Sequence, residues 1–262
     1  MPISLFDSHC HVDMPDFDAD RTEVFARAAQ AGVGGMVLVA SSAVNLSRVV
    51  EIARGRAGVR MAAGISPFEA PLYSDVLPAI EEMLAENQLA AVGECGLDFY
   101  HDTFPPGVQA AAFSAQIALA AKFGRPLIVH CRDAWDESRA LIDAASVRYG
   151  SALRGVIHCF TGNADDAQFF ARRGFSISFA GNLTYKKADD IRAALRAIPI
   201  ENVLFETDSP YLAPFPLRGR RCEPAFVLHT VEFAAKFLGI PLDDLARITT
   251  GNAVALFGEA EQ

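Results

Sequence analysis

Short apolar runs alternate with longer segments of helical period along almost the whole chain. Eight of these runs have the near-continuous hydrophobicity of parallel strands that are covered on both faces. We therefore predict strands at 4–9, 35–41, 59–65, 89–95, 125–131, 154–160, 174–181 and 201–208.

The segments between the runs repeat apolar residues every three or four positions, which predicts amphipathic helices. In 107–123, for example, Phe113, Ile117 and Ala121 recur at intervals of four. Asn163 and Asp136 are expected to begin helices, because a short side-chain oxygen there can accept a hydrogen bond from a free backbone N–H. The predicted helices are 19–31, 43–54, 75–87, 107–123, 136–148, 164–173, 186–197, 224–238 and 242–256.

Eight strand-then-helix units of about 33 residues each fit a (β/α)8 TIM barrel. A doubly wound open sheet has the same local pattern, but it usually needs fewer strands, and no G-x-G-x-x-G follows the first run. No linker rich in proline, glycine or serine divides the chain. We therefore predict an α/β fold with a single TIM-barrel domain over 1–262.

The composition is that of an ordinary globular enzyme, and the formal net charge of −9 gives no global positive field for nucleic acid. An anionic substrate would need local groups or bound cations to attract it. No run approaches the roughly 20 apolar residues of a membrane span, and the N-terminus lacks the features of a signal peptide. Five cysteines, an odd number, do not suggest a disulfide framework, so we expect a cytoplasmic protein without a membrane partner.

Coordinating side chains gather where predicted strands end. In a TIM barrel the loops after the strands surround one pocket, so chemistry collects there. A single such residue would be an ordinary strand-end residue. Burying several around one mouth would cost several kcal/mol unless a cation satisfied them, which favours a metal site. The predicted ligands are His9, His11, Glu94, His130, His158 and Asp208.

The strand period separates these ligands from the cysteines beside them. Residues two apart on a strand face the same way, so His9 and His11 can reach one ion while Cys10 points toward the helices. Cys95, Cys131 and Cys159 likewise follow Glu94, His130 and His158. We expect all four cysteines to pack outward as small apolar side chains. No C-x2-C pair supports a sulfur-rich zinc site.

Four imidazoles and two carboxylates are too many for one tetrahedral catalytic ion. They suit two divalent ions that share Glu94 as a bridging carboxylate. Mixed nitrogen and oxygen donors favour Zn, Mn, Ni or Fe, and Mg, which prefers all-oxygen shells, stays a candidate. Two such ions would add about four positive charges at the mouth and so attract an anionic substrate.

Five motifs at these positions resemble those of the TatD family of metal-dependent deoxyribonucleases. They are F-D-S-H-C-H-V-D, V-G-E-C-G-L-D-F-Y, P-L-I-V-H-C-R-D-A, G-V-I-H-C-F-T-G and L-F-E-T-D-S-P-Y-L, and R-G-R-R-C-E-P-A-F-V and G-N-A-V-A-L-F follow. The resemblance covers residues 6 to 257. It implies a divalent-metal phosphodiesterase, most often a 3'-5' exonuclease on single-stranded DNA ends, with the same six residues as metal ligands.

Two positions depart from the family pattern. Members commonly have G-x-H-P-H where this chain has Gly64-Ile65-Ser66-Pro67-Phe68, and Asn often stands at the position of Cys222. Ser66 can still donate a hydrogen bond to a phosphate oxygen, but it carries no positive charge. If the missing histidines hold the substrate phosphate, activity should be lower or the substrate altered.

The leading mechanism is attack by a hydroxide that bridges the two ions, with Asp208 as general base and Glu94 as bridge. Glu206 is expected to orient a ligand histidine, although a structural buried ion pair is an equal alternative. Arg132 can contact phosphate or form a local salt bridge. The predicted substrate contacts are Ser66, Arg132, Tyr100 and Arg221, and Lys186, Lys187, Arg218 and Arg220 share the basic late loops, which can also be plain solvated surface.

The expected partners are DNA ends or another phosphodiester substrate, with no obligatory protein partner. The first alternative is another binuclear hydrolase, such as a lactonase, amidohydrolase or phosphotriesterase. Amidohydrolase relatives often use a carboxylated lysine as the bridge, whereas this chain offers Glu94. The second alternative is a metal-binding protein with little turnover.

Overall fold

The computed structural model describes residues 4–43, 46–101 and 103–258. Eight parallel strands form one sheet in sequence order, and a helix follows each of them. The strands are β1 (Leu5–Cys10), β2 (Val33–Val39), β3 (Val59–Ala63), β4 (Ala91–Asp98), β5 (Leu127–Arg132), β6 (Gly155–Ile157), β7 (Phe175–Phe179) and β8 (Val203–Phe205). The helices are α1 (Arg21–Gln30), α2 (Leu46–Ala53), α3 (Tyr73–Ala85), α4 (Pro106–Phe123), α5 (Trp135–Tyr149), α6 (Ala164–Ala171), α7 (Asp189–Ala197), α8 (Val227–Leu238) and α9 (Leu242–Phe257).

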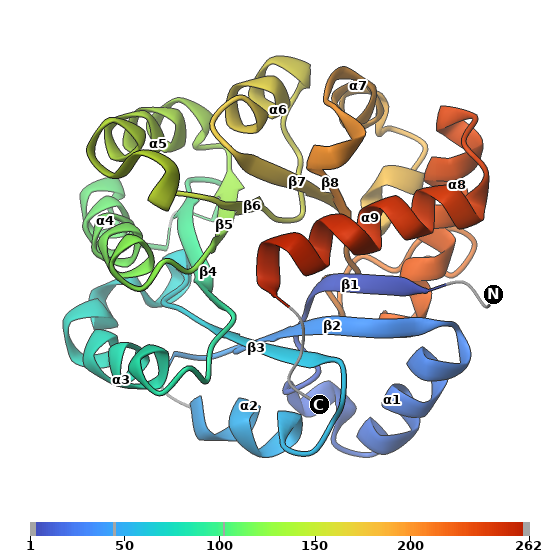
Figure 1. Ribbon diagram of the computed structural model, residues 1–262, viewed down its shortest axis with the longest axis horizontal. Coiled ribbons are helices and arrows are strands. Elements are labelled where there is room, and N and C mark those ends of the chain that lie inside the picture. Colours follow the sequence, from blue (N-terminus) through green and yellow to red (C-terminus); the bar gives the residue numbers. More distant parts are fainter. Residues whose placement is uncertain (1–3, 44–45, 102, 259–262) are drawn as a thin grey trace.

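The sheet closes on itself where β1 meets the segment after β8. Cys10 and Ser209 form a parallel bridge, and the Asp208 N–H donates to the His9 carbonyl oxygen at 2.9 Å. The helices ring the outside of the strands (Figure 1). The predicted TIM barrel is therefore confirmed. That residues 1–262 form a single domain stays a prediction.

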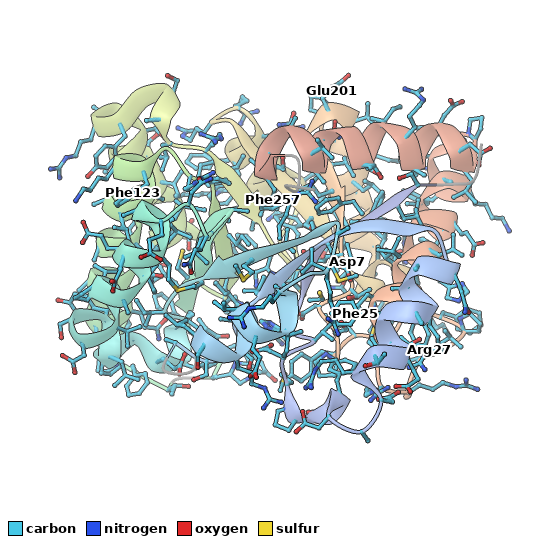
Figure 2. All side chains as sticks on the ribbon, turned by 60° about the horizontal axis from the view of Figure 1, so that its bottom comes forward. Asp7, Phe25, Arg27, Phe123, Glu201 and Phe257 are labelled. Carbon is cyan, nitrogen blue, oxygen red and sulfur yellow. The ribbon has the colours of Figure 1, made fainter. Side chains whose placement is uncertain are left out.

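One end of the barrel is filled with apolar side chains. Phe6, Ala91, Ile128 and their neighbours from seven of the eight strands form an inner cluster with the last turn of α9. The rings of Phe6 and Phe257 stack at 6.2 Å between centroids. α9 crosses in front of the strands in Figure 1, and Figure 2 marks Phe257 at its end. This closure leaves the carboxyl ends of the strands as the open mouth.

Two strands break the simple alternation of sides. Phe6 belongs to the inner cluster and Cys10 to the cluster between strands and helices, although strict alternation would put both on one side. Ala91 and Cys95 of β4 differ in the same way. The pairing register shifts between Asp7 and Cys10 and again between Val92 and Cys95. These irregularities lie where His9 and Glu94 enter the mouth.

Most predicted elements are confirmed within a few residues, but three strand ends were wrong. β4 continues four residues past Glu94 to Asp98, because the ladder with β5 extends and the Gln109 side chain holds the Asp98 backbone at both N–H and carbonyl. β6 ends at Ile157 and β8 at Phe205, so His158 and Asp208 lie beyond the strands.

Of the two predicted helix starts, the one at Asn163 is confirmed and the one at Asp136 was wrong. Asn163 caps α6 with a complete capping box. Asp136 does not begin α5, because the helix starts one residue earlier and Asp136 lies in its first turn, where a carboxylate stabilises the helix dipole. In the predicted helix 43–54, positions 44–45 lie outside the described residues.

No single helix of the described ranges is long and apolar enough to cross a membrane. The segments Pro224–Leu238 and Leu242–Phe257 pass that test only together, across a bend of 115°.

Candidate metal centre

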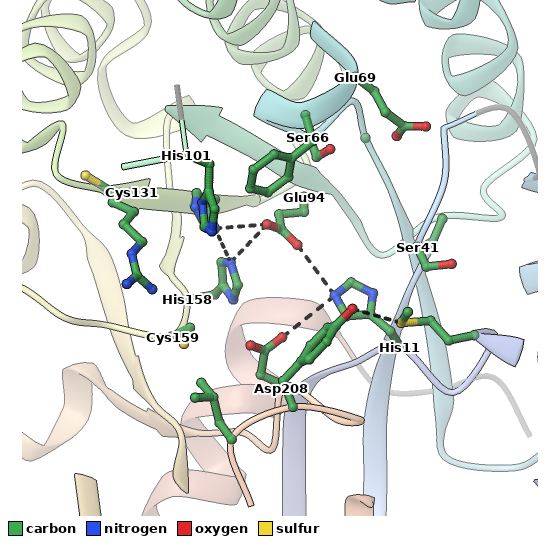
Figure 3. Close-up of a pocket in the computed structure, with 18 of the residues that line it drawn as sticks. His11, Ser41, Ser66, Glu69, Glu94, His101, Cys131, His158, Cys159 and Asp208 are labelled. Carbon is green, nitrogen blue, oxygen red and sulfur yellow. Dashed lines mark hydrogen bonds and ion pairs between the residues drawn. The ribbon is translucent and has the colours of Figure 1, made fainter. Parts of the chain in front are cut away.

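The six predicted ligands meet at the open mouth of the barrel. A cavity of about 490 Å³ lies there, lined from the ends of β1 to β6 and from the loop after β8. Five of the six line this cavity, and His9 is fully buried beside it. Figure 3 shows Glu94 between His158 on one side and His11 on the other.

One oxygen of Glu94 belongs to the group nearest β1. Glu94 Oε2 lies 3.5 Å from His9 Nε2 and 3.6 Å from His11 Nε2. Asp208 Oδ1 lies 3.8 Å from each of these two nitrogens. Three nitrogen or oxygen donors of His9, His11 and Asp208 thus converge within the span that one cation would bridge.

The other oxygen of Glu94 belongs to a second group. Glu94 Oε1 lies 3.0 Å from His130 Nδ1 and 3.3 Å from His158 Nε2, and these two nitrogens are 3.3 Å apart. The carboxylate therefore faces two histidine pairs with one oxygen each. This is the arrangement that a carboxylate bridge between two ions requires.

Two of the rings carry a proton on the nitrogen that faces away from Glu94. His11 Nδ1 lies 3.0 Å from the Val39 carbonyl oxygen, which can only accept, so Nδ1 carries the proton. His130 Nε2 lies 2.9 Å from the carboxylate of Asp98 and is protonated for the same reason. In neutral rings the opposite nitrogens then present lone pairs to the oxygens of Glu94. A positive charge between these groups stabilises them, and either a metal ion or a second proton on the ring supplies it.

Glu206 supports the ring of His158. Its Oε1 lies 3.4 Å from His158 Nδ1 and accepts a hydrogen bond of 2.7 Å from the Cys159 N–H. Burial acts to raise the pKa of Glu206, but the contact with His158 outweighs it and holds that pKa below its usual value. The contact fits the expected orienting role, which stays a prediction. His9 Nδ1 is buried and has no hydrogen-bond partner among the described residues.

The pKa values in this cluster reflect burial and the close approach of the histidines and carboxylates. Burial lowers the pKa of His9 to about 4 and raises that of Asp208 to about 6. For His11, burial acts in the lowering direction, but contacts with Glu94 and Asp208 raise its pKa to about 9. The two neighbouring rings thus differ in proton affinity because burial and the charge of His158 outweigh the contact with Glu94 at His9, whereas the carboxylates outweigh burial at His11.

One functional candidate, Asp98, was missed from the sequence. Asp98 is almost fully buried and accepts from His130 Nε2 at 2.9 Å and from His101 Nδ1 at 3.0 Å, so it fixes the ring of His130. His101 also lines the cavity. An acidic residue four positions after Glu94, followed three positions later by a histidine, was the available signal.

Asp7 is a second missed residue. Its carboxylate accepts from the Thr207 N–H at 2.8 Å and the Thr207 hydroxyl at 2.6 Å. Burial raises the pKa of Asp7 to about 8 despite these hydrogen bonds. The contact ties β1 to the loop after β8 and so fixes Asp208 relative to His9.

The structure separates the four predicted substrate contacts. Ser66 and Arg132 line the cavity. Tyr100 is exposed and lies outside the lining, with the Arg132 guanidinium over its ring at 4.2 Å. Arg221 is not brought to the cavity, because Asp20 holds its guanidinium through two contacts of 2.7 Å.

One cysteine prediction was wrong. Cys10, Cys95 and Cys131 belong to the outer core between strands and helices, as expected, although Cys131 also borders the cavity. Cys159 instead lines the cavity, with a backbone φ of 44°. Because β6 ends before His158, the two-residue alternation no longer applies at this position.

The departure at Ser66 and Phe68 changes the cavity rim. Phe68 lines the cavity, and its ring lies edge to face with those of His101 at 5.3 Å and His130 at 6.0 Å. Phe68 is 39% exposed and Tyr211 is 51% exposed, and both face the same opening. At position 68 the rim therefore presents an uncharged aromatic ring, whereas a histidine there would present a hydrogen-bond donor.

Known proteins match the chain over almost its full length. A family model described as TatD related DNase matches residues 6–258. The metal-dependent hydrolase YabD of Bacillus subtilis (strain 168) is 34% identical over 254 residues, which cover 97% of this chain and 98% of the relative. The 3'-5' ssDNA/RNA exonuclease TatD of Klebsiella pneumoniae (strain 342) is 36% identical over 260 residues, with 97% and 98% covered. The crystal structure of YJJV, a TatD homologue of Escherichia coli K12, superposes with a TM-score of 0.88 at 28% identity over 98% of this chain and 99% of that one.

Proposed function

This chain belongs to the TatD-related DNase family of metal-dependent hydrolases, and we propose that it removes nucleotides from the 3' ends of unpaired DNA or RNA strands. The position of Glu94 carries the proposal, because its two oxygens face two separate histidine pairs. The exonuclease name of a relative at 36% identity supports this substrate class.

The proposed cofactors are two divalent cations of the series Mg, Mn, Zn and Ni. His9, His11 and Asp208 would hold one, His130 and His158 would hold the other, and Glu94 would bridge them. Bound there, the cations would neutralise the charge of the phosphate and supply an acidified water at neutral pH.

The chain's own residues supply the remaining steps. Asp208 is positioned to accept the proton of the attacking water as its oxygen bonds to phosphorus. The bond from phosphorus to the 3' oxygen breaks, and that oxygen takes a proton, which leaves a 3'-hydroxyl on the strand and a nucleoside 5'-phosphate as product. Arg132 on the cavity wall donates hydrogen bonds to a phosphate oxygen.

The aromatic rim suits unpaired bases. Phe68 and Tyr211 expose their rings at the opening, and stacking on such rings is worth about 1–3 kcal/mol per base without regard to sequence. Paired bases inside a duplex would not offer their faces to these rings. The rim therefore supports a single-stranded substrate.

The cellular location that we propose is the cytoplasm. The five free cysteines support it, because disulfides are rare there.

Timed digestion of end-labelled single-stranded DNA and RNA tests the proposal. Wild-type protein with manganese should release 5'-mononucleotides from the 3' end, and EDTA should stop the release. Asp208→Asn should lose at least about a hundredfold in kcat, because the proton acceptor is gone. Asp136→Asn, the same change at an exposed position of α5, is the matched control. Wild-type kcat in Asp208→Asn would contradict the proposed base.

The uncharged side chains of Ser66 and Phe68 also favour a second candidate, a binuclear hydrolase for neutral esters such as phosphotriesters or lactones. Phe68 and Ser66 offer no positive charge to a phosphodiester. The same protein preparation should therefore be tried on a phosphotriester and a lactone. Faster turnover of either than of a DNA end would favour this second candidate.

A further inference from the structure

The opposite end of the barrel carries a second cavity, far from the metal centre along the strands. It encloses about 580 Å³ between the end of α2, the start of β3, the segment before β4 and the last residues of α9. No aspartate or glutamate stands among the described residues that line it. Its four charged side chains are all arginines: Arg54, Arg56, Arg60 and Arg125.

Three of these arginines lack a carboxylate partner within the part of the chain that the structure describes. Arg54 makes no ion pair there, Arg56 lies over the ring of Phe25 at 4.5 Å, and Arg125 donates to the neutral amide oxygen of Asn87. Arginines elsewhere, such as Arg27 and Arg221, pair with acidic side chains. In a chain of net charge −9, this cavity is a local concentration of positive charge.

Arg60 is the most buried of the four arginines at 9% exposure. Its Nε donates to the Gly258 carbonyl oxygen at 2.7 Å, and its guanidinium lies over the ring of Phe6 at 4.8 Å. Phe6 in turn stacks on Phe257, which lines the cavity. The cavity is therefore in contact with the apolar plug that closes the barrel.

Apart from the arginines and the amides of Asn87 and Gln88, the side chains that line the cavity are apolar. Val59, Met61, Leu89 and Phe257 form much of it, and a smaller apolar hollow of about 210 Å³ shares the wall of Arg56 and Val59. Sites for small organic ligands commonly measure roughly 300–1,000 Å³ and combine such apolar walls with a few charged groups. Guanidinium groups bind phosphate oxygens in a bidentate manner.

We propose that this cavity binds an organic phosphate of nucleotide size, with its phosphates on Arg54, Arg56 and Arg125 and its base or other flat body on the apolar wall. The ligand would lie against Met61 and Phe257. The site is separate from the metal centre, so its occupancy does not depend on hydrolysis. A bound ligand should also stabilise the fold, because it contacts the plug of the barrel.

Calorimetric titration of the full chain with ADP tests the proposal. Arg54→Gln/Arg56→Gln removes two charges, one at an exposed and one at a half-buried position, and should raise the dissociation constant for ADP at this site at least tenfold. Arg148→Gln/Arg172→Gln removes two exposed charges on other helices and should leave it unchanged. ADP should raise the thermal midpoint by a few degrees in wild type and in the control, and not in the cavity variant. Equal affinity in the two double variants would overturn the proposal.

Two further arms identify the ligand and separate this site from the catalytic one. Asp208→Asn should keep the arginine-dependent ADP binding, so failure of the proposed nuclease activity leaves this result intact. Inorganic pyrophosphate should bind more weakly than ADP, because it lacks the flat body. A short single-stranded oligonucleotide that binds through these arginines while ADP does not would contradict a small-ligand site.

The acidic residues next in sequence provide a last check. Glu259 and Glu261, which lie outside the described residues, follow Gly258 at the cavity wall. Their carboxylates are negatively charged, like the phosphates of the proposed ligand. Glu259→Gln/Glu261→Gln should therefore bind ADP as tightly as wild type or more tightly, and weaker binding would count against the proposal.

Discussion

The two ends of the barrel use the same strands for opposite purposes. At the carboxyl ends, His9, Glu94 and Asp208 bring ionisable side chains close together around an open cavity. At the amino ends, Phe6 of β1 and Phe257 of α9 stack within an apolar plug. Stability is therefore concentrated at one end, and chemistry at the other.

This contrast predicts that the two ends respond differently to substitution. Changes at the mouth should lower turnover and leave the folding free energy nearly intact. Changes at the plug should do the reverse.

The largest effect is expected for His130→Ala at the mouth. Losing a residue that only hydrogen-bonds to a metal ligand typically costs roughly 10–100-fold. This substitution removes a proposed ligand itself, so kcat should fall by more than that. The thermal midpoint without metal should not fall, because one buried polar ring is gone. Cleavage rates and differential scanning calorimetry measure the two effects. His229→Ala on α8 is the matched control, since that ring is partly exposed and lies outside the cavity, with Glu232 and Phe226 beside it.

Phe257→Ala at the plug should give the opposite result. Truncating this buried ring should lower the free energy of unfolding by about 3–5 kcal/mol, with kcat per folded molecule unchanged. Urea denaturation measures the loss. Phe215→Ala, at a ring that is 70% exposed, should change stability by less than about 0.5 kcal/mol. A fall in kcat with intact stability would show that the two ends are not independent.

Asp98→Asn should show a smaller effect at the mouth. Asp98 fixes the ring of His130, so its loss should reduce metal affinity or kcat by about 10–100-fold. The manganese concentration that restores half of the activity is the measurement, because a misplaced ring acts first on metal binding. Asp165→Asn, at an exposed position of α6, makes the same chemical change away from the cavity. Identical manganese curves for the two variants would remove Asp98 from the site.

The smallest effect is expected for Asp20→Asn, outside both ends. Hydrogen bonds from Arg221 and Arg27 hold the pKa of Asp20 well below its usual range. A depressed pKa means that the contribution to stability is present above about pH 4 and is lost as the pH falls below that value. The difference in thermal midpoint between wild type and variant should be constant from pH 5 to 7 and shrink toward pH 3. Because the pair is partly exposed, the effect should stay below about 1 kcal/mol.

The sequence was a good guide to the fold because both of its signals are local. Apolar runs and helical periods need no knowledge of partners, and the alternation on β5 correctly puts His130 at the mouth and Cys131 in the outer core. The convergence of the six proposed ligands also followed from one rule about strand ends. Their role as ligands stays a prediction.

The errors arise where distant partners decide. Arg221 reads as a free basic residue on a late loop, but its partner Asp20 lies 201 positions away in sequence. Asp98 was overlooked because the extension of β4 depends on Gln109 of α4 and on pairing with β5. Cys159 could not be placed by alternation because β6 stops short. Each of these features is set by tertiary contacts that a local pattern does not contain.

The register shifts in β1 and β4 have a consequence for protein engineering. Each shift reverses the alternation of side chains along its strand. After it, odd-numbered residues lie on the side of the sheet, barrel interior or helices, where even-numbered residues lay before. Grafting only the six side chains onto a regular barrel would turn His9 and Glu94 toward the helices. A transplant of this centre therefore has to carry the backbone irregularities of both strands along with the side chains.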